Sequence, residues 1–315
     1  MILCVGLSPA VQRTLQFDEF VLGQVNRARD GQVTASGKAV NVARVLRLLG
    51  SHPLLVQALG GDGGRLVTRA LETLDIEHAS VVLPDSAPTR TCVTLLTDGL
   101  PPTELVEEAP PLSLDAVAAV TTAVRERLPH ARALCLSGSL PRGVPPGFYA
   151  DLIQTANELG LVTVVDAQKA PLRASLEAKP FLVKPNLEEA LATLERAPTG
   201  DEAADLRAAV QGLRDAGAVW SLVSVGRRGS LLGGPDGLWR LTSPPVNAVN
   251  AIGSGDALTA GLLHAHVDQG RGIPDAAAFG TACGAANCLT PTSGVIRPTD
   301  LPALLAEVRV ASVSA

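Results

Sequence analysis

The residues best suited to chemistry lie in the segment 249–263, where Gly253, Ser254 and Gly255 form a turn before Asp256 and an apolar stretch with helical character. Free backbone N–H groups at a helix start, with the helix dipole, attract a phosphate group. Glycine lets the backbone approach such an anion closely. Asp256, in the first turn, either accepts a proton from a hydroxyl that attacks a phosphate or serves only as a favourable helix-end charge.

A second predicted helix start, within residues 35–44, carries Lys38 and Asn41 three residues apart and on one side of the helix. The Gly-Lys pair in this segment suggests a P-loop, but that motif needs glycine at position 32 and serine or threonine at 39. The chain has Gln32 and Ala39 there. The remaining prediction is a helix amino terminus with a cation and an amide, which suits an anionic polyol.

The composition restricts the class of protein. The 315 residues are 46% hydrophobic and 18% charged, as in a globular protein with a sizeable core. A net charge of −5 without a basic stripe, and only 3% aromatic residues, argue against a nucleic-acid partner. Five cysteines without Cys-x-x-Cys spacing predict free thiols. With no signal-peptide pattern and no bilayer span, we expect a soluble cytoplasmic protein without a membrane partner.

Short apolar runs alternate with helical patterns along the chain. This alternation predicts an α/β fold with a mostly parallel central sheet and helices on both faces. Ligands of such sheets bind beyond the carboxyl ends of the strands. Polar residues expected at these ends lie at 137–139, 166, 186 and 224–226.

Two segments, about 11–34 and 88–108, alternate polar and β-branched residues and predict half-exposed strands. They form either a lid or dimerisation flap inserted into a single domain spanning residues 1–315, or a plain surface hairpin. Residues 233–237 predict a hairpin turn, and the tail after about 298 predicts a final helix.

In this order and separation, these motifs resemble the ribokinase-like (PfkB) family of carbohydrate kinases. Within it the chain is most similar to the branch of 1-phosphofructokinase and tagatose-6-phosphate kinase. The resemblance implies a ribokinase-like fold with a small β lid, ATP and Mg²⁺ as cofactors, and phosphoryl transfer to a sugar alcohol. The segments that carry it are 8–10, 25–27, 37–42, 60–62, 89–90, 138–141, 184–189, 223–229 and 253–256.

The resemblance also implies roles for the matching residues around ATP. Asp256 would take the proton of the accepting hydroxyl, while the N–H groups of Gly253, Ser254 and Gly255 stabilise the transferring phosphoryl group. Glu189 would hold Mg²⁺ through water. The residues that would contact ATP are Lys184 and Asn186 at the phosphates and Ser224, Gly226, Gly229 and Asn287 at the adenosine.

Asn186 and Glu189 also fit a purely structural role. Asn186 precedes a predicted helix and Glu189 follows three residues later, which is the spacing of a capping box. Both roles can hold at once.

On the acceptor side, the resemblance implies that Arg27, Lys38 and Arg90 bind the phosphate that the sugar already carries, since converging cations recognise a phosphomonoester. Gly37, Asn41 and Ser139 would bind sugar hydroxyls or the same phosphate.

Three departures from the branch affect the acceptor. Gln12 stands where the branch has an acidic residue that accepts sugar hydroxyls, although an amide can also accept a hydrogen bond. Ser36 and Ala39 add bulk where the branch has glycines, and the turn after Asp166 is Ala-Gln-Lys. None of these changes touches Asp256.

The expected reaction is the conversion of fructose 1-phosphate to fructose 1,6-bisphosphate. Tagatose 6-phosphate and fructose 6-phosphate are the alternative acceptors, and a homodimer through the lid strands is expected. A sugar-phosphate-binding protein with lost catalysis is the non-enzymatic alternative. A dinucleotide-dependent oxidoreductase is disfavoured because no Gly-x-Gly-x-x-Gly follows the first strand.

Overall fold

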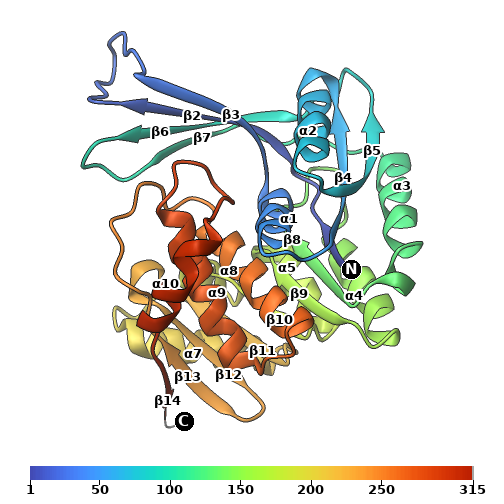
Figure 1. The fold of residues 1–315 in the computed structure, drawn as a ribbon. Helices are drawn as coiled ribbons and strands as arrows, with labels where there is room; N and C mark the ends of the chain where they lie inside the picture. The colour runs from blue at the N-terminus through green and yellow to red at the C-terminus, as the bar shows by residue number, and fades with distance from the viewer. Residues whose placement is uncertain (314–315) are drawn as a thin grey trace.

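The structure, a computed structural model, describes residues 1–313, and a large twisted sheet forms its centre (Figure 1). The strand order is β14-β13-β12-β11-β10-β9-β8-β1-β4-β5, and the pairs from β11 through β5 are parallel. The strands of this sheet are β1 (Ile2–Val5), β4 (Pro53–Gly60), β5 (Glu77–Leu83), β8 (Ala133–Ser137), β9 (Val162–Asp166), β10 (Leu182–Val183), β11 (Trp220–Ser224), β12 (Ser230–Gly234), β13 (Gly237–Leu241) and β14 (Val310–Val313).

Helices cover both faces of this sheet, as the alternation of apolar runs and helical patterns predicts. One face carries α1 (Lys38–Leu48), α2 (Gly61–Thr73), α8 (Ser254–Leu263), α9 (Ile273–Cys288) and α10 (Leu301–Glu307). The other carries α3 (Leu114–Arg125), α4 (Phe148–Glu158), α5 (Lys169–Glu177), α6 (Leu187–Thr193) and α7 (Glu202–Asp215). The predicted α/β class is therefore confirmed.

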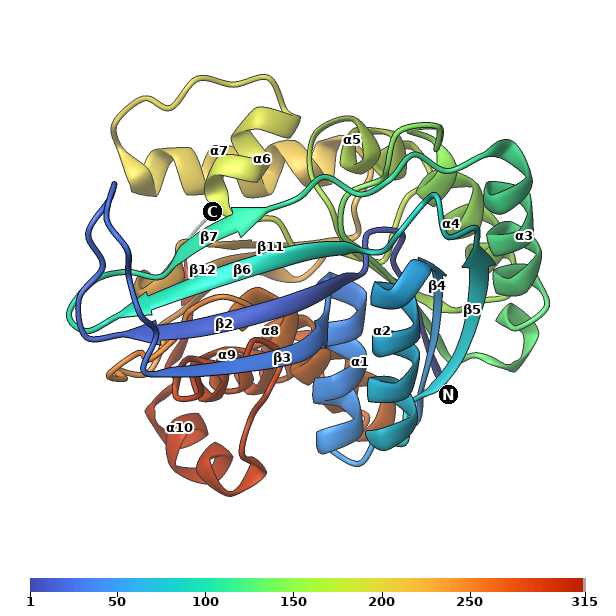
Figure 2. The ribbon, with the colours of Figure 1, turned by 90° about the horizontal axis from the view of Figure 1, so that it is seen from above.

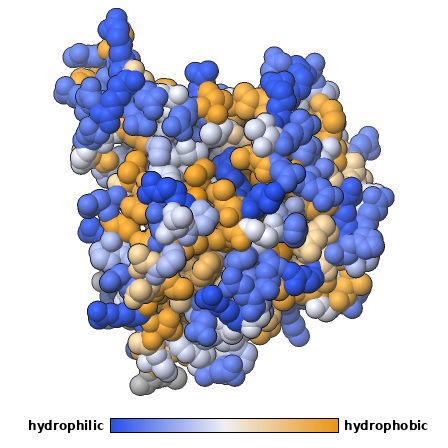
Figure 3. Space-filling view, viewed as in Figure 1, coloured by the Kyte–Doolittle hydropathy of each residue, from blue (hydrophilic) through white to orange (hydrophobic). Residues whose placement is uncertain are grey.

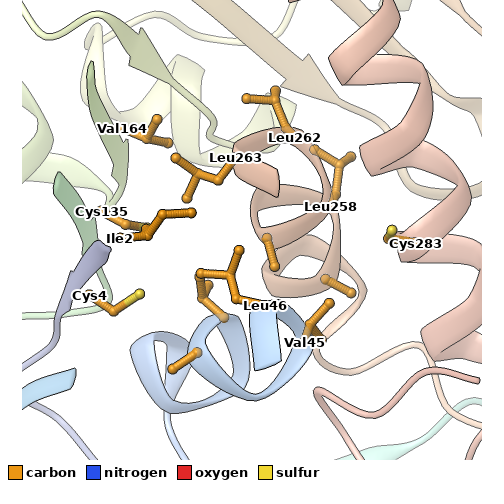
Figure 4. Close-up of a cluster of buried hydrophobic side chains, with 14 of the residues drawn as sticks. Ile2, Cys4, Val45, Leu46, Cys135, Val164, Leu258, Leu262, Leu263 and Cys283 are labelled. Carbon is orange, nitrogen blue, oxygen red and sulfur yellow. The ribbon is translucent and has the colours of Figure 1, made fainter. Parts of the chain in front are cut away.

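The core on the first face determines where the two chemically promising segments lie. Val45 and Leu46 of α1 and Leu263 of α8 lie in one buried cluster, which Ile2 closes from the sheet (Figure 4). All are buried, so their contacts stabilise the pairing of the two helices by removing apolar surface from water. The pairing brings the amino ends of α1 and α8 together.

A second sheet forms a flap that projects from the body (Figure 1). Its strands are β2 (Ala10–Phe17), β3 (Asp30–Ser36), β6 (Arg90–Thr97) and β7 (Thr103–Val106), in the order β3-β2-β6-β7. Seen from above, the flap lies across the side of the molecule that holds α8 and α9 (Figure 2). The strands predicted at about 11–34 and 88–108 are thus confirmed, and they form one separate sheet.

The surface differs between the flap and the body. The projecting end of the flap is largely hydrophilic, whereas hydrophobic residues gather over the helices below it (Figure 3). Some apolar side chains of the flap are nevertheless exposed, including Val33, Leu105 and Val106.

The carboxyl-terminal segment differs from its prediction. The hairpin turn predicted at 233–237 is confirmed between β12 and β13. The predicted helix after about residue 298 is present as α10, which ends at Glu307. The prediction that this helix is the final element is wrong. Val310–Val313 instead form β14, which pairs antiparallel with β13 at the sheet edge. The β-branched residues of this segment favour a strand once a neighbouring edge is available.

Candidate active site

The starts of α1 and α8 form a single site. Asn41 Nδ2 donates a hydrogen bond of 2.8 Å to Asp256 Oδ2, although the two residues lie 215 positions apart in the chain. Asn41 exposes 4% of its surface and Asp256 6%. The carboxyl group of Asp256 is therefore shielded from bulk water but lies among polar partners, as a functional carboxylate requires.

The environment of Asp256 adjusts its proton affinity. Burial has the largest effect and raises the pKa of Asp256, and the negative charge of Asp166 raises it further. The charge of Lys38, the hydrogen bond from Asn41 and the charge of Lys184 lower it, and the resulting pKa is about 7. A general base with a pKa near the working pH combines an available carboxylate with adequate proton affinity.

The turn before Asp256 is open to an anion. Gly253 has a φ of 84°, and a side chain there would begin 2.8 Å from the backbone N of Gly294, so only glycine fits. Among the described residues, no side chain caps the first turn of α8. A Cβ on Gly255 would lie 3.2 Å from Lys184 Nζ, which places that ammonium group beside the turn. The Ser254 N–H already donates to the Ala251 carbonyl oxygen at 3.2 Å. The glycine N–H groups of the turn and the Lys184 ammonium group therefore remain as donors for an anion.

Asp166 connects the two lysines of the site. It ends β9 and exposes 1% of its surface. Its Oδ1 lies 2.7 Å from Lys38 Nζ and its Oδ2 lies 3.0 Å from Lys184 Nζ. Burial alone would raise the pKa of Asp166, but the charges of Lys184 and Lys38 outweigh that effect and lower the pKa to about 2. Asp166 therefore stays ionised and fixes both ammonium groups.

Lys38 consequently differs from a free surface cation. Besides Asp166, it faces Glu189, whose Oε1 lies 3.8 Å from Lys38 Nζ. Burial lowers the pKa of Lys38, but the charges of Asp166, Glu189 and Asp256 outweigh burial and raise it. Lys38 is thus always protonated and is shared between the acidic residues and any anion in the adjoining cavity.

Asn186 and Glu189 form the predicted capping box at the start of α6. Asn186 Oδ1 accepts from the Glu189 backbone N–H at 2.8 Å, and Glu189 Oε2 accepts from the Asn186 N–H at 2.9 Å. The structural role of this pair is confirmed. Glu189 Oε1 remains on the side of Lys38, and the side chain is 18% exposed. That oxygen can still hold a hydrated cation.

A cavity of about 120 Å³ adjoins these charges. Four of the seven predicted acceptor residues line it, namely Gly37, Lys38, Arg90 and Ser139. The guanidinium group of Arg90 donates to the carbonyl oxygens of Ser8 and Glu107 at 3.0 Å each, while its buried Nε has no partner. Arg90 is therefore held in place, and its Nε–H is among the donors left for a ligand.

The other three predicted acceptor residues lie elsewhere. Asn41 is bonded to Asp256, as described above. Gln12 is buried in the flap, and its Nε2 donates to Thr94 Oγ1 at 2.8 Å across β2 and β6. Arg27 is exposed in the loop between β2 and β3. The structure thus brings neither Gln12 nor Arg27 into the cavity.

A larger pocket of about 620 Å³ lies at the carboxyl ends of β10 and β11. Asn186, Ser224 and Gly226 line it together with apolar residues of α6. Asn186 and Ser224 are also joined by an isolated parallel bridge. Three of the predicted ATP-contacting residues therefore line one pocket. Its first lining residue, Asn186, lies two positions after Lys184 in the chain.

Comparison with known proteins decides the family. A model of the pfkB family carbohydrate kinases matches residues 1–300. The chain belongs to this family. It is therefore an ATP-dependent sugar kinase, as predicted, and not an oxidoreductase.

Solved structures resemble this PfkB kinase along almost its full length. Phosphofructokinase-2 from Escherichia coli, in complex with potassium, is 24% identical, with a TM-score of 0.86 over 97% of this chain and 98% of that one. A possible 1-phosphofructokinase from Thermotoga maritima is 21% identical, with a TM-score of 0.89 over 99% of both chains. These likenesses confirm the ribokinase-like fold.

Two residues predicted at the adenosine have other contacts in this PfkB kinase. Asn287 is fully buried in α9, donates to the Ile252 carbonyl at 2.9 Å and accepts from the Gly294 N–H at 2.7 Å. A side chain at Gly229, with a φ of 89°, would begin 2.0 Å from the Leu241 carbonyl oxygen. Asn287 and Gly229 therefore support loops beside the site and do not line the pocket that contains Asn186. That they contact the adenosine stays a prediction.

Asp166 was not predicted as a site residue, although it appeared among the polar strand ends. The signal that could have identified it is an aspartate at the end of a mostly apolar strand, at the sheet edge where the lysines at 38 and 184 were already predicted.

Two predictions about the whole chain can also be compared with the structure. The five cysteines are free thiols, as predicted. None of the helices described in residues 1–313 is long and apolar enough to span a membrane.

Proposed function

We propose that this kinase phosphorylates a ketohexose phosphate, with fructose 1-phosphate as the acceptor and fructose 1,6-bisphosphate as the product. The observation that carries the proposal is the position of Asp256. It is a buried carboxylate with a pKa of about 7, at an open helix start, and Lys38 connects it with a cavity that also holds Arg90. A base, a phosphoryl site and an anionic acceptor site are then neighbours.

In the proposed reaction, Asp256 accepts the proton of the acceptor hydroxyl as that oxygen attacks the γ-phosphoryl group of ATP. The bond between this group and the β-phosphate oxygen breaks, and ADP leaves. The N–H groups of Gly253 and Gly255 and the ammonium of Lys184 stabilise the negative charge of the transition state, while the Ser254 N–H is held by the Ala251 carbonyl oxygen. Such donors contribute several kcal/mol where water is excluded. Asn41 holds the carboxyl group in place through its hydrogen bond. Asp166 positions Lys184 by direct ion pairing.

ATP is proposed to lie along the carboxyl ends of β10 and β11. The pocket containing Asn186, Ser224 and Gly226 supports this placement, because it begins next to Lys184 and the phosphates then reach the turn before α8. Mg²⁺ bound to ATP would neutralise phosphate charge. Within the described residues, no cluster of three or more His, Cys, Asp or Glu could hold a metal. Glu189 alone fits a hydrated Mg²⁺ that the nucleotide phosphates also bind.

The acceptor phosphate is proposed to bind Lys38, Arg90 and Ser139, and the test is a substrate panel. ADP release would be measured with fructose 1-phosphate, fructose 6-phosphate, tagatose 6-phosphate and fructose. We expect the largest kcat/KM for fructose 1-phosphate. Arg90→Gln should raise KM for phosphorylated acceptors about tenfold or more, since a charged hydrogen bond is lost. Arg69→Gln, on the exposed side of α2, is the matched control. Turnover of fructose alone would refute the phosphate site.

We also propose that residues 1–315 act as one catalytic domain and that two copies pair through the flap. The exposed side chains of Val33, Leu105 and Val106 and the unpaired edges of β3 and β7 support pairing, because an apolar sheet edge favours association. The free cysteines support a cytoplasmic location. A monomeric mass by light scattering at micromolar concentration would refute the dimer.

A further inference from the structure

Gln57 is the one polar residue in the otherwise apolar sequence of β4, PLLVQALG. It is fully buried on the same face of the sheet as Leu55 and Leu59. A leucine or valine at this position would pack without any polar atom to satisfy. The presence of an amide here therefore needs a physical reason.

The amide of Gln57 is only partly satisfied within the described residues. Its Nε2 donates a long hydrogen bond of 3.4 Å to Ser80 Oγ on β5, and its Oε1 has no partner. Because a hydroxyl can donate or accept, turning the amide over would pair Oε1 with Ser80 and leave Nε2 unpaired instead. In either orientation one buried polar atom is free, and such an atom typically costs about 1–3 kcal/mol of stability.

The same residue lines the cavity that holds the predicted acceptor residues. Lys38 and Arg90 also line this cavity, and Arg90 Nε is a buried donor without a partner. One wall thus offers an unused acceptor and another offers an unused donor. A bound molecule that donates and accepts hydrogen bonds would satisfy both groups.

The chemistry of these groups identifies the kind of ligand group involved. A phosphate dianion has only acceptor oxygens, so it pairs with Lys38 and Arg90, and it could pair with Gln57 only through Nε2 in the turned orientation. A sugar hydroxyl donates one hydrogen bond and accepts others, so it can pair with Gln57 Oε1 while its oxygen accepts from a neighbouring donor.

We propose that Gln57 determines acceptor specificity by accepting a hydrogen bond from a sugar hydroxyl next to the phosphate. The inference rests on the proposed acceptor cavity. A site built to bond a hydroxyl strongly rejects an analogue without it, because its polar group then stays buried and unpaired. Gln57 is thus a binding residue. Its unpaired amide atom lowers the stability of the free protein, and the hydrogen bond from the sugar hydroxyl offsets that loss on binding.

The test uses Gln57→Met, which keeps the unbranched shape and removes the amide. We expect kcat/KM for the best acceptor to fall about tenfold, while KM for ATP stays unchanged. The midpoint of thermal unfolding should stay the same or rise by about 2 °C, because an unpaired buried group is removed. Gln211→Met, at an exposed position of α7, is the matched control and should change neither quantity.

Deoxy analogues of the acceptor identify the contact. The wild-type enzyme should discriminate about tenfold or more against the analogue that lacks the bonded hydroxyl, and Gln57→Met should lose that discrimination. Unchanged kcat/KM in the variant would refute the proposal, as would a lower unfolding temperature with KM for ATP raised as well. If the wild-type enzyme used only an unphosphorylated sugar, the proposed phosphate site would be refuted. The role of Gln57 would then be tested by measuring kcat/KM of the wild type and of Gln57→Met with that sugar and its deoxy analogues.

Discussion

Replacing Asp256 with asparagine should separate the contribution of this carboxylate to the reaction rate from its effect on the free energy of unfolding. The change keeps the shape of the side chain and removes its charge and basicity. We expect kcat to fall at least 100-fold, because positioned general bases contribute about 10²–10⁴-fold. ATP binding should persist, since the turn and Lys184 are untouched. A variant with more than a few per cent of the wild-type rate would show that Asp256 is not the base.

The stability effect follows from the raised pKa. Asp256 has a pKa of about 7 in the folded protein, mainly through burial, against an ordinary value of 3.8. The folded protein therefore holds this proton more tightly than the unfolded chain does. The stabilisation is fully present below about pH 4 and is lost as pH rises through 7. At about 1.4 kcal/mol per pKa step, the loss is on the order of 4 kcal/mol.

Asparagine does not ionise, so Asp256→Asn should avoid this loss. We expect the variant to be more stable than wild type at pH 8, by up to about 4 kcal/mol, and nearly equal to it at about pH 4 and below. Urea unfolding followed by circular dichroism at the two pH values measures the difference. A difference independent of pH, or a variant less stable at pH 8, would refute the reasoning.

Three further outcomes follow from the same site. With the wild-type enzyme, kcat/KM for the acceptor should rise with pH and reach half its maximum near pH 7, where Asp256 loses its proton; a flat profile between pH 6 and 8 would contradict this. Asp166→Asn should lower kcat and stability together, because Lys38 and Lys184 lose their ion-pair partner. It should also move the half-maximum of the pH profile to lower pH, because a negative charge near Asp256 is removed. Chemical denaturation and the pH profile of kcat/KM test these two effects. Asn287→Ala should cost about 1–3 kcal/mol in urea unfolding, since two buried backbone groups lose their hydrogen bonds, and an unchanged midpoint would count against a supporting role.

The helix starts of the site could be predicted from the sequence because their signals are local. A glycine-containing turn followed by apolar residues predicts α8, and the spacing of apolar residues predicts α1. That Asn41 reaches Asp256 is not a local property, since it depends on the packing of Val45 and Leu46 against α8. The resemblance to a family assigned Asn41 to the acceptor, so neither it nor the residues alone predicted this contact.

Other features could not be predicted because the deciding partners are distant. Asp166 is fixed by two lysines from separate helix and strand ends, and no pattern around residue 166 indicates them. Asn287 was assigned to the adenosine only through the family resemblance, and nothing in the sequence indicates that its side chain bonds the backbone of two loops. The strand β14 depends on the free edge of β13, which the tail sequence does not reveal.

The pairing within the flap has a mechanical consequence. Ala10 is in register with Ser36 on one side and with Arg90 on the other. β3 ends at Ser36, directly before Gly37 and the first residue of α1. Any tilt of the flap relative to the body must therefore displace both walls of the acceptor cavity at once. A binding partner that holds the flap in one position would therefore change the affinity of the cavity for the sugar without contacting the sugar.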